Sequence, residues 1–323
     1  MTAHTSRRIF IAGACLSLVG SSRAAGWPSK PVRLIVPVAA GSPPDVIARV
    51  VSDRLSTLWK QQVIVDNKSG ASGIIGMGAI KQAAPDDHVF ILAQAATITV
   101  TPHVNAAARY DIDADLTPVA LVGMSPLVIV AARDFPASTA SEFVARARSS
   151  RVAVNVGVTG NHSLPHLTAE LIKRSAALNF NIVPFPSSGA ALTAVVNGDV
   201  QVMIDGIPGV DAMLRSDRIK ALAVTSLSRL AQMPQVQALS EVIPNTEVNG
   251  WFVLFGKKQT SAAVAQTVNQ DVNKLMEDKE LRAKLLELGV FPRPLFPAQV
   301  RDFVDRERKR WWTLIRDLGI KPQ

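Results

Sequence analysis

Apolar residues cluster at regular intervals along the chain, and the first cluster has the layout of a strand followed by a helix. Residues 32–38 form a nearly continuous apolar run rich in β-branched side chains, which predicts a strand buried on both faces of a parallel sheet. Residues 39–44 are small or proline and cannot extend that strand. From Asp45, which we expect to cap a helix, apolar positions recur every three or four residues to Leu58. Open α/β sheets bind ligands at this kind of junction.

The same order recurs through the rest of the chain. Short apolar runs predict strands at 63–65, 89–92, 119–122, 128–131, 152–156, 182–183, 200–204, 221–224 and 251–255. Small polar or glycine-rich segments and amphipathic helices separate most of them, which indicates an α/β fold with largely parallel sheets. A long helix is expected over residues 300–318, with Trp311 and Trp312 as packing residues.

The length of 323 residues is sufficient for two lobes, each with its own core. We expect the chain to cross between lobes at a break over residues 123–126 and to return at 251–255. Lobe 1 is predicted to comprise residues 25–124 and 246–323, and lobe 2 residues 125–245. Each lobe is predicted to be a mainly parallel sheet flanked by helices, and the crossing strands are predicted to form a hinge.

Residues 1–24 have the three parts of a secretory signal peptide. Arg7 and Arg8 precede an apolar core at residues 9–19, and Ala24 is a small residue suited to cleavage. The core has about 11 residues, whereas about 20 are needed to span a bilayer. The paired arginines also fit a twin-arginine signal, so the Sec and Tat export routes both stay open. We expect a periplasmic protein.

Composition and charge argue against several classes of function. The net charge is +9, and it falls to +6 when the three arginines of the leader are removed. The basic residues are spread along the chain and aromatic residues make up 5%, so a nucleic-acid-binding surface is not expected. The single cysteine, Cys15, lies in the leader, so the mature chain would have neither a disulfide nor thiol chemistry.

The segments that follow the strands carry the candidate binding residues. Small side chains, main-chain N–H groups and hydroxyls there are suited to capture a carboxylate without a charged partner. Asp45 is expected first as a helix cap, and Asp205 is expected either to accept a ligand hydrogen bond, to cap the next helix or to brace the hinge. The candidate residues are Ala39, Ala40, Gly41, Ser42, Asp45, Ser72, Gly73, Ile74, Ala95, Thr97, Thr159, Asn161, His162, Ser163, Phe185, Ser187 and Asp205.

Metal and enzyme chemistry find little support in the sequence. His162 and His166 have the spacing of metal ligands on a helix, but Pro165 lies between them and no Cys or Glu completes a set. No nucleophile elbow, phosphate-binding loop, dinucleotide motif or pair of catalytic carboxylates stands out. We therefore predict no metal, no cofactor and no catalytic residues.

Several motifs in this order resemble the substrate-binding proteins of tripartite tricarboxylate transporters, also called the Bug family. The resemblance runs over nearly the whole mature chain and rests on an ordered set of individually weak motifs. They are Trp27-Pro28-Ser29-Lys30-Pro31 with Gly41, Asp45 and Ala48-Arg49; Asp66-Asn67 with Gly70, Gly73 and Gly76; Ala83-Ala84-Pro85-Asp86; Thr117-Pro118; Gly160; His166-Leu167 with Glu170; Val183-Pro184-Phe185; Asp205; and Leu222-Ala223-Val224-Thr225.

The resemblance implies a two-lobed, type II-like periplasmic binding protein that closes about a hinge. It implies a small organic acid or amino acid as ligand and two membrane permease subunits as partners. Independently of the resemblance, we expect a monomer. The chain departs from the family pattern at Pro43-Pro44, which lack N–H groups, and at Phe185-Pro186-Ser187, where the family usually has Tyr-Lys-Gly. Two alternatives stay open, a ligand sensor that signals to a membrane receptor and a secreted enzyme on the same scaffold.

Overall fold

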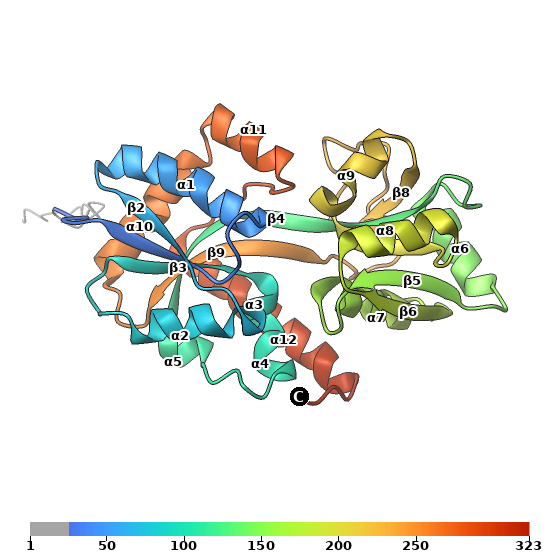
Figure 1. Cartoon of the computed structure of the whole chain (residues 1–323), viewed down its shortest axis with the longest axis horizontal. Coiled ribbons are helices and arrows are strands. Elements are labelled where there is room, and N and C mark those ends of the chain that lie inside the picture. The colour runs from blue at the N-terminus through green and yellow to red at the C-terminus, as the bar shows by residue number, and fades with distance from the viewer. Residues whose placement is uncertain (1–25, 323) are drawn as a thin grey trace, which may run out of the picture.

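The computed structural model describes residues 26–322, in which two α/β lobes are joined by one strand that belongs to both sheets and by a second strand that leads back into the first lobe (Figure 1). The predicted signal peptide and Cys15 lie outside these residues. No helix in the described part of the chain is both long enough and apolar enough to cross a membrane.

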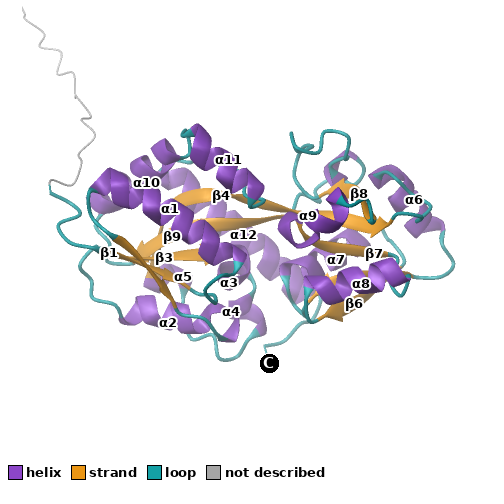
Figure 2. Ribbon diagram, turned by 45° about the horizontal axis from the view of Figure 1, so that its top comes forward, coloured by secondary structure: helices purple, strands orange, loops and turns teal. Residues whose placement is uncertain are grey.

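Lobe 1 is built on a five-stranded sheet in the order β2-β1-β3-β9-β4. β1 is parallel to β2 and β3, whereas β9 is antiparallel to both β3 and β4, so four strands run one way and β9 runs the other. Helices pack on both faces of the sheet, as Figure 2 shows. The strands are β1 (Val32–Val36), β2 (Val63–Asn67), β3 (Val89–Gln94), β4 (Leu116–Ala132) and β9 (Asn249–Lys257). The helices are α1 (Pro43–Trp59), α10 (Ala262–Leu275) and α11 (Lys279–Glu287) on one face, and α2 (Ile74–Gln82), α3 (Ala95–Thr99), α5 (Ile112–Asp115) and the first half of α12 (Pro297–Asp317) on the other. The short η1 (Ala71–Gly73) precedes α2, and α4 (Thr101–Val104) follows α3.

Lobe 2 has a second five-stranded sheet in the order β8-β4-β7-β5-β6. β5 is parallel to β6 and β7, and the second part of β4 is antiparallel to β7 and β8, so again four strands share one direction. The strands are β5 (Val154–Thr159), β6 (Phe180–Phe185), β7 (Val202–Gly206) and β8 (Ile219–Val224). α6 (Ala140–Ser149) and α7 (Leu164–Ser175) cover one face, α8 (Ser188–Asn197) and α9 (Ile207–Arg215) cover the other, and η2 (Leu239–Glu241) precedes the return to β9. The mainly parallel, two-lobed fold predicted from the sequence is confirmed.

The crossing between lobes is a continuous strand, not the break expected at residues 123–126. β4 runs unbroken for 17 residues and pairs with β9 as far as Pro126, then with β7 and β8 from Leu127 and Val128. Gly123 is present because the chain after α11 passes over it: a Cβ there would lie 2.6 Å from a Val290 methyl. The glycine therefore marks a close approach of two backbones within a strand, which sequence alone does not distinguish from a turn.

α12 connects the two cores. Its first half packs in lobe 1, whereas Trp311 and Ile315 pack in the core of lobe 2. The indole N–H groups of Trp311 and Trp251 both donate to Glu307 at 3.3 Å, and burial raises the pKa of Glu307. Trp311 is a packing residue as predicted, but Trp312 is 45% exposed, so that prediction is wrong.

Other local predictions differ by a few residues or hold only in part. The sequence Thr139-Ala140-Ser141-Glu142 predicts a capping box, and the structure has one half of it. The Thr139 hydroxyl accepts the Glu142 N–H at 3.1 Å, but the Glu142 carboxylate accepts the N–H of Ser138 and not that of the N-cap residue Thr139. The strand expected over 152–156 begins at Val154. The helix expected after Asp205 is α9, but its N-cap residue is Gly206, so the alternative in which Asp205 caps this helix is wrong. Pro208 lies in the first turn of α9, where proline is well tolerated.

Candidate functional site

Strand directions bring the carboxyl ends of both sheets to the gap between the lobes. β3 runs in the same direction as β4 and ends at Gln94. Gln94 pairs with Phe252 of β9, and Phe252 in turn lies opposite Gly123 of β4. β7 runs against β4 and ends at Gly206, opposite Leu127. The two strand ends are therefore four residues apart along β4, a spacing of about 13 Å at about 3.3 Å per residue. The segments that follow these strands therefore point toward each other from the two lobes.

The loop after β1 offers main-chain N–H groups from Ala39 and Ala40 at the surface of lobe 1. Ser42 is the N-cap residue of α1, and its hydroxyl donates to the Ala39 carbonyl at 2.6 Å. Pro43 and Pro44 form the first turn of α1, so two N–H groups that a helix start normally offers are missing. The N–H groups of Ala39 and Ala40 have no partner among residues 26–322 and are the donors that this loop can give to a ligand.

Asp45 lies inside the first turn of α1 and braces the loop, which corrects the prediction that it caps the helix. Its carboxylate accepts hydrogen bonds from the Gly41 N–H at 2.8 Å, the Arg49 guanidinium at 2.9 Å and the Asn67 amide at 2.8 Å. Burial would raise the pKa of Asp45, but these three partners hold it below its usual range. Asp45 is buried and fully used by these bonds, so we assign it a positioning role.

The glycine-rich turn before α2 lies against the start of α3. Gly73 has a φ of 92°, and a Cβ there would lie 2.8 Å from the Thr97 side chain. Ser72 is exposed and also has a left-handed backbone, with φ of 55°. Ile74 is half-buried as the first residue of α2. The turn and Thr97 thus form one continuous patch of lobe 1.

Ala95 and Thr97 belong to α3, so the candidate segment after β3 is a short helix and not a loop. α3 starts directly after β3 and buries Ala95, Thr97 and Ile98. The Thr97 carbonyl accepts the Tyr110 hydroxyl at 2.5 Å, and burial raises the pKa of Tyr110. The sequence of α3 does not reveal that a helix follows the strand, because α3 is too short to show a helical period of apolar residues.

In lobe 2, the loop after β5 is held by a pair of histidines. Thr159 ends β5, Asn161 is exposed, and Ser163 caps α7 by accepting the His166 N–H at 3.2 Å. His162 has a φ of 55°, and its main-chain N–H donates to Nδ1 of His166 at 2.8 Å. Burial lowers the pKa of His166, so this acceptor nitrogen is kept unprotonated.

The histidine pair is not arranged as a metal site. The two rings stack with centroids 5.8 Å apart, and Nδ1 of His166 is used by the main chain. Within residues 26–322, no group of three or more His, Cys, Asp or Glu side chains is placed to hold a metal ion. His162 is therefore positioned by His166 at the edge of the gap.

Asp205 connects three elements of lobe 2 at the end of β7. Its Oδ1 accepts the Gly206 N–H at 2.8 Å and the Thr159 hydroxyl at 3.5 Å, whereas Oδ2 accepts no hydrogen bond among the described residues. The side chain is 8% exposed. Burial raises the pKa of Asp205, while the Ser188 hydroxyl, the Gly206 N–H and the Thr159 hydroxyl oppose this shift.

Ser187 and Phe185 complete the lobe 2 set. Phe185 ends β6, and Ser187 caps α8 by accepting the Ala190 N–H at 3.3 Å. The hydrogen bonds and close contacts described above join predicted residues of the same lobe. The two groups lie on opposite sides of the gap, and their joint role in binding stays a prediction.

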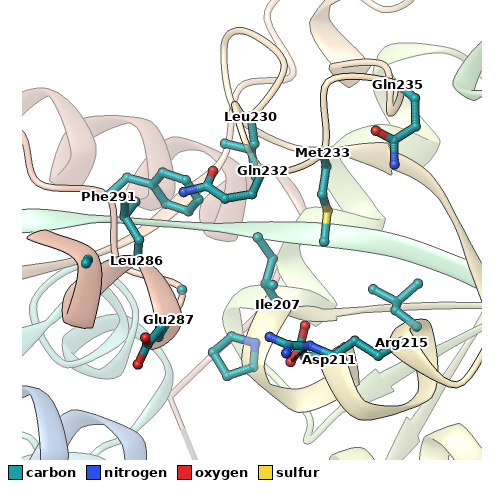
Figure 3. A pocket seen from close by; sticks show the side chains of 14 residues that line it. Ile207, Asp211, Arg215, Leu230, Gln232, Met233, Gln235, Leu286, Glu287 and Phe291 are labelled. Carbon is teal, nitrogen blue, oxygen red and sulfur yellow. Dashed lines mark ion pairs between the residues drawn. The ribbon is translucent and has the colours of Figure 1, made fainter.

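A hollow between α9 and α11, with a volume of about 600 Å³, was not expected from the sequence (Figure 3). Its walls come from both lobes, and a Cβ at Gly289 would lie 2.8 Å from the Pro208 ring. It lies beside the end of β7, because Ile207 and Pro208 follow Gly206 directly. The helical spacing of Ile207, Val210 and Leu214 was the signal that could have revealed this wall. Its side chains include Ile207, Pro208, Asp211, Leu214, Arg215, Met233, Leu286 and Phe291.

Comparisons with known proteins agree with this architecture. The family described as "Tripartite tricarboxylate transporter family receptor" matches residues 47–320. The chain is 33% identical to a UPF0065 protein of Bordetella bronchiseptica, over 98% of this chain and 94% of that protein. It is 30% identical to protein BugT of Bordetella pertussis, over 97% of this chain and 96% of that protein.

Two solved structures with bound acids have the same fold. Rpa4515 of R. palustris with adipate is 27% identical, with a TM-score of 0.77 over 92% of this chain and 100% of that one. MatC of Rhodopseudomonas palustris with bound malate is 29% identical, with a TM-score of 0.71 over 90% of this chain and 100% of that one. The chain therefore belongs to the tripartite tricarboxylate transporter receptor family, which includes the Bug proteins.

Proposed function

We propose that this protein is a periplasmic solute-binding protein that captures a small carboxylate-bearing solute between its lobes and delivers it to a two-subunit membrane permease. The observation that carries the proposal is that strand ends from both sheets point toward each other, at positions about 13 Å apart along β4. The adipate and malate bound by similar structures support a carboxylate as the ligand class.

The ligand would be held mainly by main-chain dipoles and hydroxyls. The unpaired N–H groups of Ala39 and Ala40 and the patch formed by Ser72, Gly73 and Thr97 both belong to lobe 1. Helix starts and oriented N–H groups stabilise an anion without a salt bridge. Closure then adds contacts from lobe 2, and the closed state is favoured by the difference in ligand affinity between the two states.

The remaining assignments belong to the same proposal. Residues 1–24 would direct export to the periplasm, and the mature protein would act as a monomer. The boundaries of lobe 1 (25–124 and 246–323) and lobe 2 (125–245) stay a proposal, with the end of α12 packed on lobe 2. The protein would act as a receptor and not as an enzyme.

A thermal-shift screen of the mature chain against organic acids and amino acids tests the function. A ligand present at one hundred times its dissociation constant adds about 2.7 kcal/mol of stability. The matched control is the neutral amide of each active acid, such as adipamide for adipate, which keeps size and shape but removes the negative charge. We expect at least one acid to raise the melting temperature and its amide to have little effect. If no acid raises it, or acid and amide act equally, the carboxylate proposal fails.

A further inference from the structure

Two candidate segments of lobe 1 are connected by side chains that the sequence did not single out. One segment is the turn at Ser72 and Gly73, and the other is α3, which carries Thr97. The Tyr110 hydroxyl donates to the Thr97 carbonyl at 2.5 Å, and the Thr101 hydroxyl donates to the Ser72 carbonyl at 3.3 Å. Burial raises the pKa of Tyr110, and the Thr101 side chain opposes this shift, so the two side chains interact. Tyr110 and Thr101 therefore connect both segments.

The Thr97 carbonyl depends on Tyr110 because α3 is short. α3 ends at Thr99 and α4 starts at Thr101, so the helix is interrupted at Val100. In an unbroken helix the Thr97 carbonyl would accept the N–H of residue 101, but no main-chain N–H in residues 26–322 donates to it. Carbonyls at a helix end need other partners, and the phenol is the partner of this one.

Tyr110 is itself held firmly in place. The next residue, Asp111, is the N-cap of α5, and its carboxylate accepts the N–H groups of Asp113 at 2.8 Å and of Ala114 at 2.9 Å. The Tyr110 ring packs against the apolar cluster of lobe 1 to which α2, α3 and α12 contribute. With its backbone and its ring both fixed, the phenol can hold the end of α3 in one position.

The hydroxyls of Ser72 and Thr97 stay available for a ligand. Neither makes a hydrogen bond with another residue in the part of the chain that the structure describes, although Thr97 is only 1% exposed. A hydroxyl on a buried residue normally has a partner, and a ligand oxygen would supply one. Gly73 lies against this hydroxyl, because a Cβ at Gly73 would be 2.8 Å from Oγ1 of Thr97. The position of α3 therefore sets where the Thr97 hydroxyl lies relative to the turn.

We infer that Tyr110 is a positioning residue of the ligand site. Its hydroxyl fixes the end of α3, and together with Thr101 it sets the spacing between Thr97 and the turn at Ser72 and Gly73. It acts through these residues and not by contact with the ligand. Binding groups hold a ligand well only when the residues around them lock their positions. This inference rests on the proposed function and adds a residue to its site.

Isothermal titration calorimetry with the Y110F variant of the mature chain tests the role of the hydroxyl. Y110F keeps the ring and its packing but removes the donor to the Thr97 carbonyl. The probe is the organic acid that raises the melting temperature most in the thermal-shift screen. We expect its dissociation constant to rise about fivefold, the factor equivalent to the net contribution of one neutral hydrogen bond.

S56A is the matched control in the same lobe. The Ser56 hydroxyl also donates to a carbonyl, that of Ser52 at 2.7 Å, and it accepts the Val63 N–H at 2.8 Å. It lies about 21 Å along α1 from the N-cap residue Ser42, at about 1.5 Å per residue. S56A should therefore lower the melting temperature but leave the dissociation constant of the acid within about twofold of wild type.

The two variants separate a positioning role from a structural one. If Y110F melts lower but binds the acid as tightly as wild type, Tyr110 has only a structural role and the inference is overturned. Equal weakening of binding in Y110F and S56A overturns it too, because loss of stability alone would then explain the change. Failure of every acid to bind the wild-type chain defeats the proposed function instead.

A second measurement needs no variant, because Tyr110 is the only tyrosine of the chain. Tyrosine labelled with heavy carbon at Cζ then gives a single NMR resonance, whose chemical shift reports the hydrogen bond of the phenol. We expect the acid to move this resonance with the dissociation constant found by calorimetry, and the neutral amide of the acid to leave it in place. A resonance that does not move at saturating acid overturns the inference, also where Y110F does not fold.

Discussion

Replacing Gly73 by alanine is expected to damage the candidate site, whereas the same replacement at Gly78, five residues later, is expected to stabilise the protein. Gly73 has a φ of 92°, and an added Cβ would lie 2.8 Å from the Thr97 hydroxyl and methyl. A left-handed backbone costs a residue with a Cβ about 1–2 kcal/mol, and the forced shift of Thr97 adds to this. We expect G73A to lose about 2 kcal/mol of unfolding free energy, or about 4 °C in melting temperature.

Gly78 provides the matched control in the helix for which Gly73 is the N-cap residue. It lies within α2, and a Cβ there would meet no atom within 4 Å. Alanine in a helix interior is about 0.5–1 kcal/mol more favourable than glycine, so G78A should melt about 1–2 °C higher than wild type. Differential scanning calorimetry gives both values, and titration with an active acid gives the affinities. We expect weaker acid binding in G73A and unchanged binding in G78A. A G73A protein with wild-type stability and affinity would refute the role assigned to this turn.

Two further predictions concern the hinge and the loop of lobe 2. The buried Thr225 hydroxyl accepts the Leu127 N–H at 2.8 Å and donates to the Val248 carbonyl at 2.6 Å. T225V removes this hydroxyl, so the Leu127 N–H and the Val248 carbonyl each lose this hydrogen bond. Urea unfolding should show that T225V lowers the free energy of unfolding by about 2–4 kcal/mol, and a decrease below about 1 kcal/mol would contradict the role assigned to this hydroxyl. Burial lowers the pKa of His166, so the unfolded chain binds a proton first and stability falls as pH decreases from about 6.5. H166N keeps an acceptor for the His162 N–H without titrating, so its melting temperature should fall less than that of wild type between about pH 7 and about pH 5.5; an equal fall would exclude His166 as the cause.

Periodicity was enough to predict the order of most strands and helices, because buried strands and amphipathic helices leave strong local patterns. It failed where a local signal had a tertiary cause. Gly123 and Pro126 indicated a break in the chain, but they lie within β4 because a second backbone passes over Gly123 and Pro126 is opposite Asn249 on β9. Trp312 and Trp311 are adjacent in sequence, yet only Trp311 faces the core of lobe 2.

The candidate site was predictable as a set of segments but not as a set of contacts. Small polar residues after apolar runs indicated the strand ends, and the register of β4 shows why these ends meet. The sequence could not reveal that Asn67, Arg49 and Gly41 converge on Asp45. It also could not reveal the hollow beside α9, because its walls come from residues about 80 positions apart along the chain.

Binding of an acid between the lobes must change the distance across the gap, and pulsed electron spin resonance can measure that distance. The only cysteine of the chain, Cys15, lies in the predicted leader, so a mature chain with S69C and T193C would carry only two spin labels. Ser69 is exposed in lobe 1 beyond β2, and Thr193 is exposed on α8 of lobe 2. We predict that an acid which raises the melting temperature shifts the label-to-label distribution to shorter distances, and that its amide does not. An unchanged distribution at saturating, calorimetrically verified acid would contradict capture by closure of the two lobes.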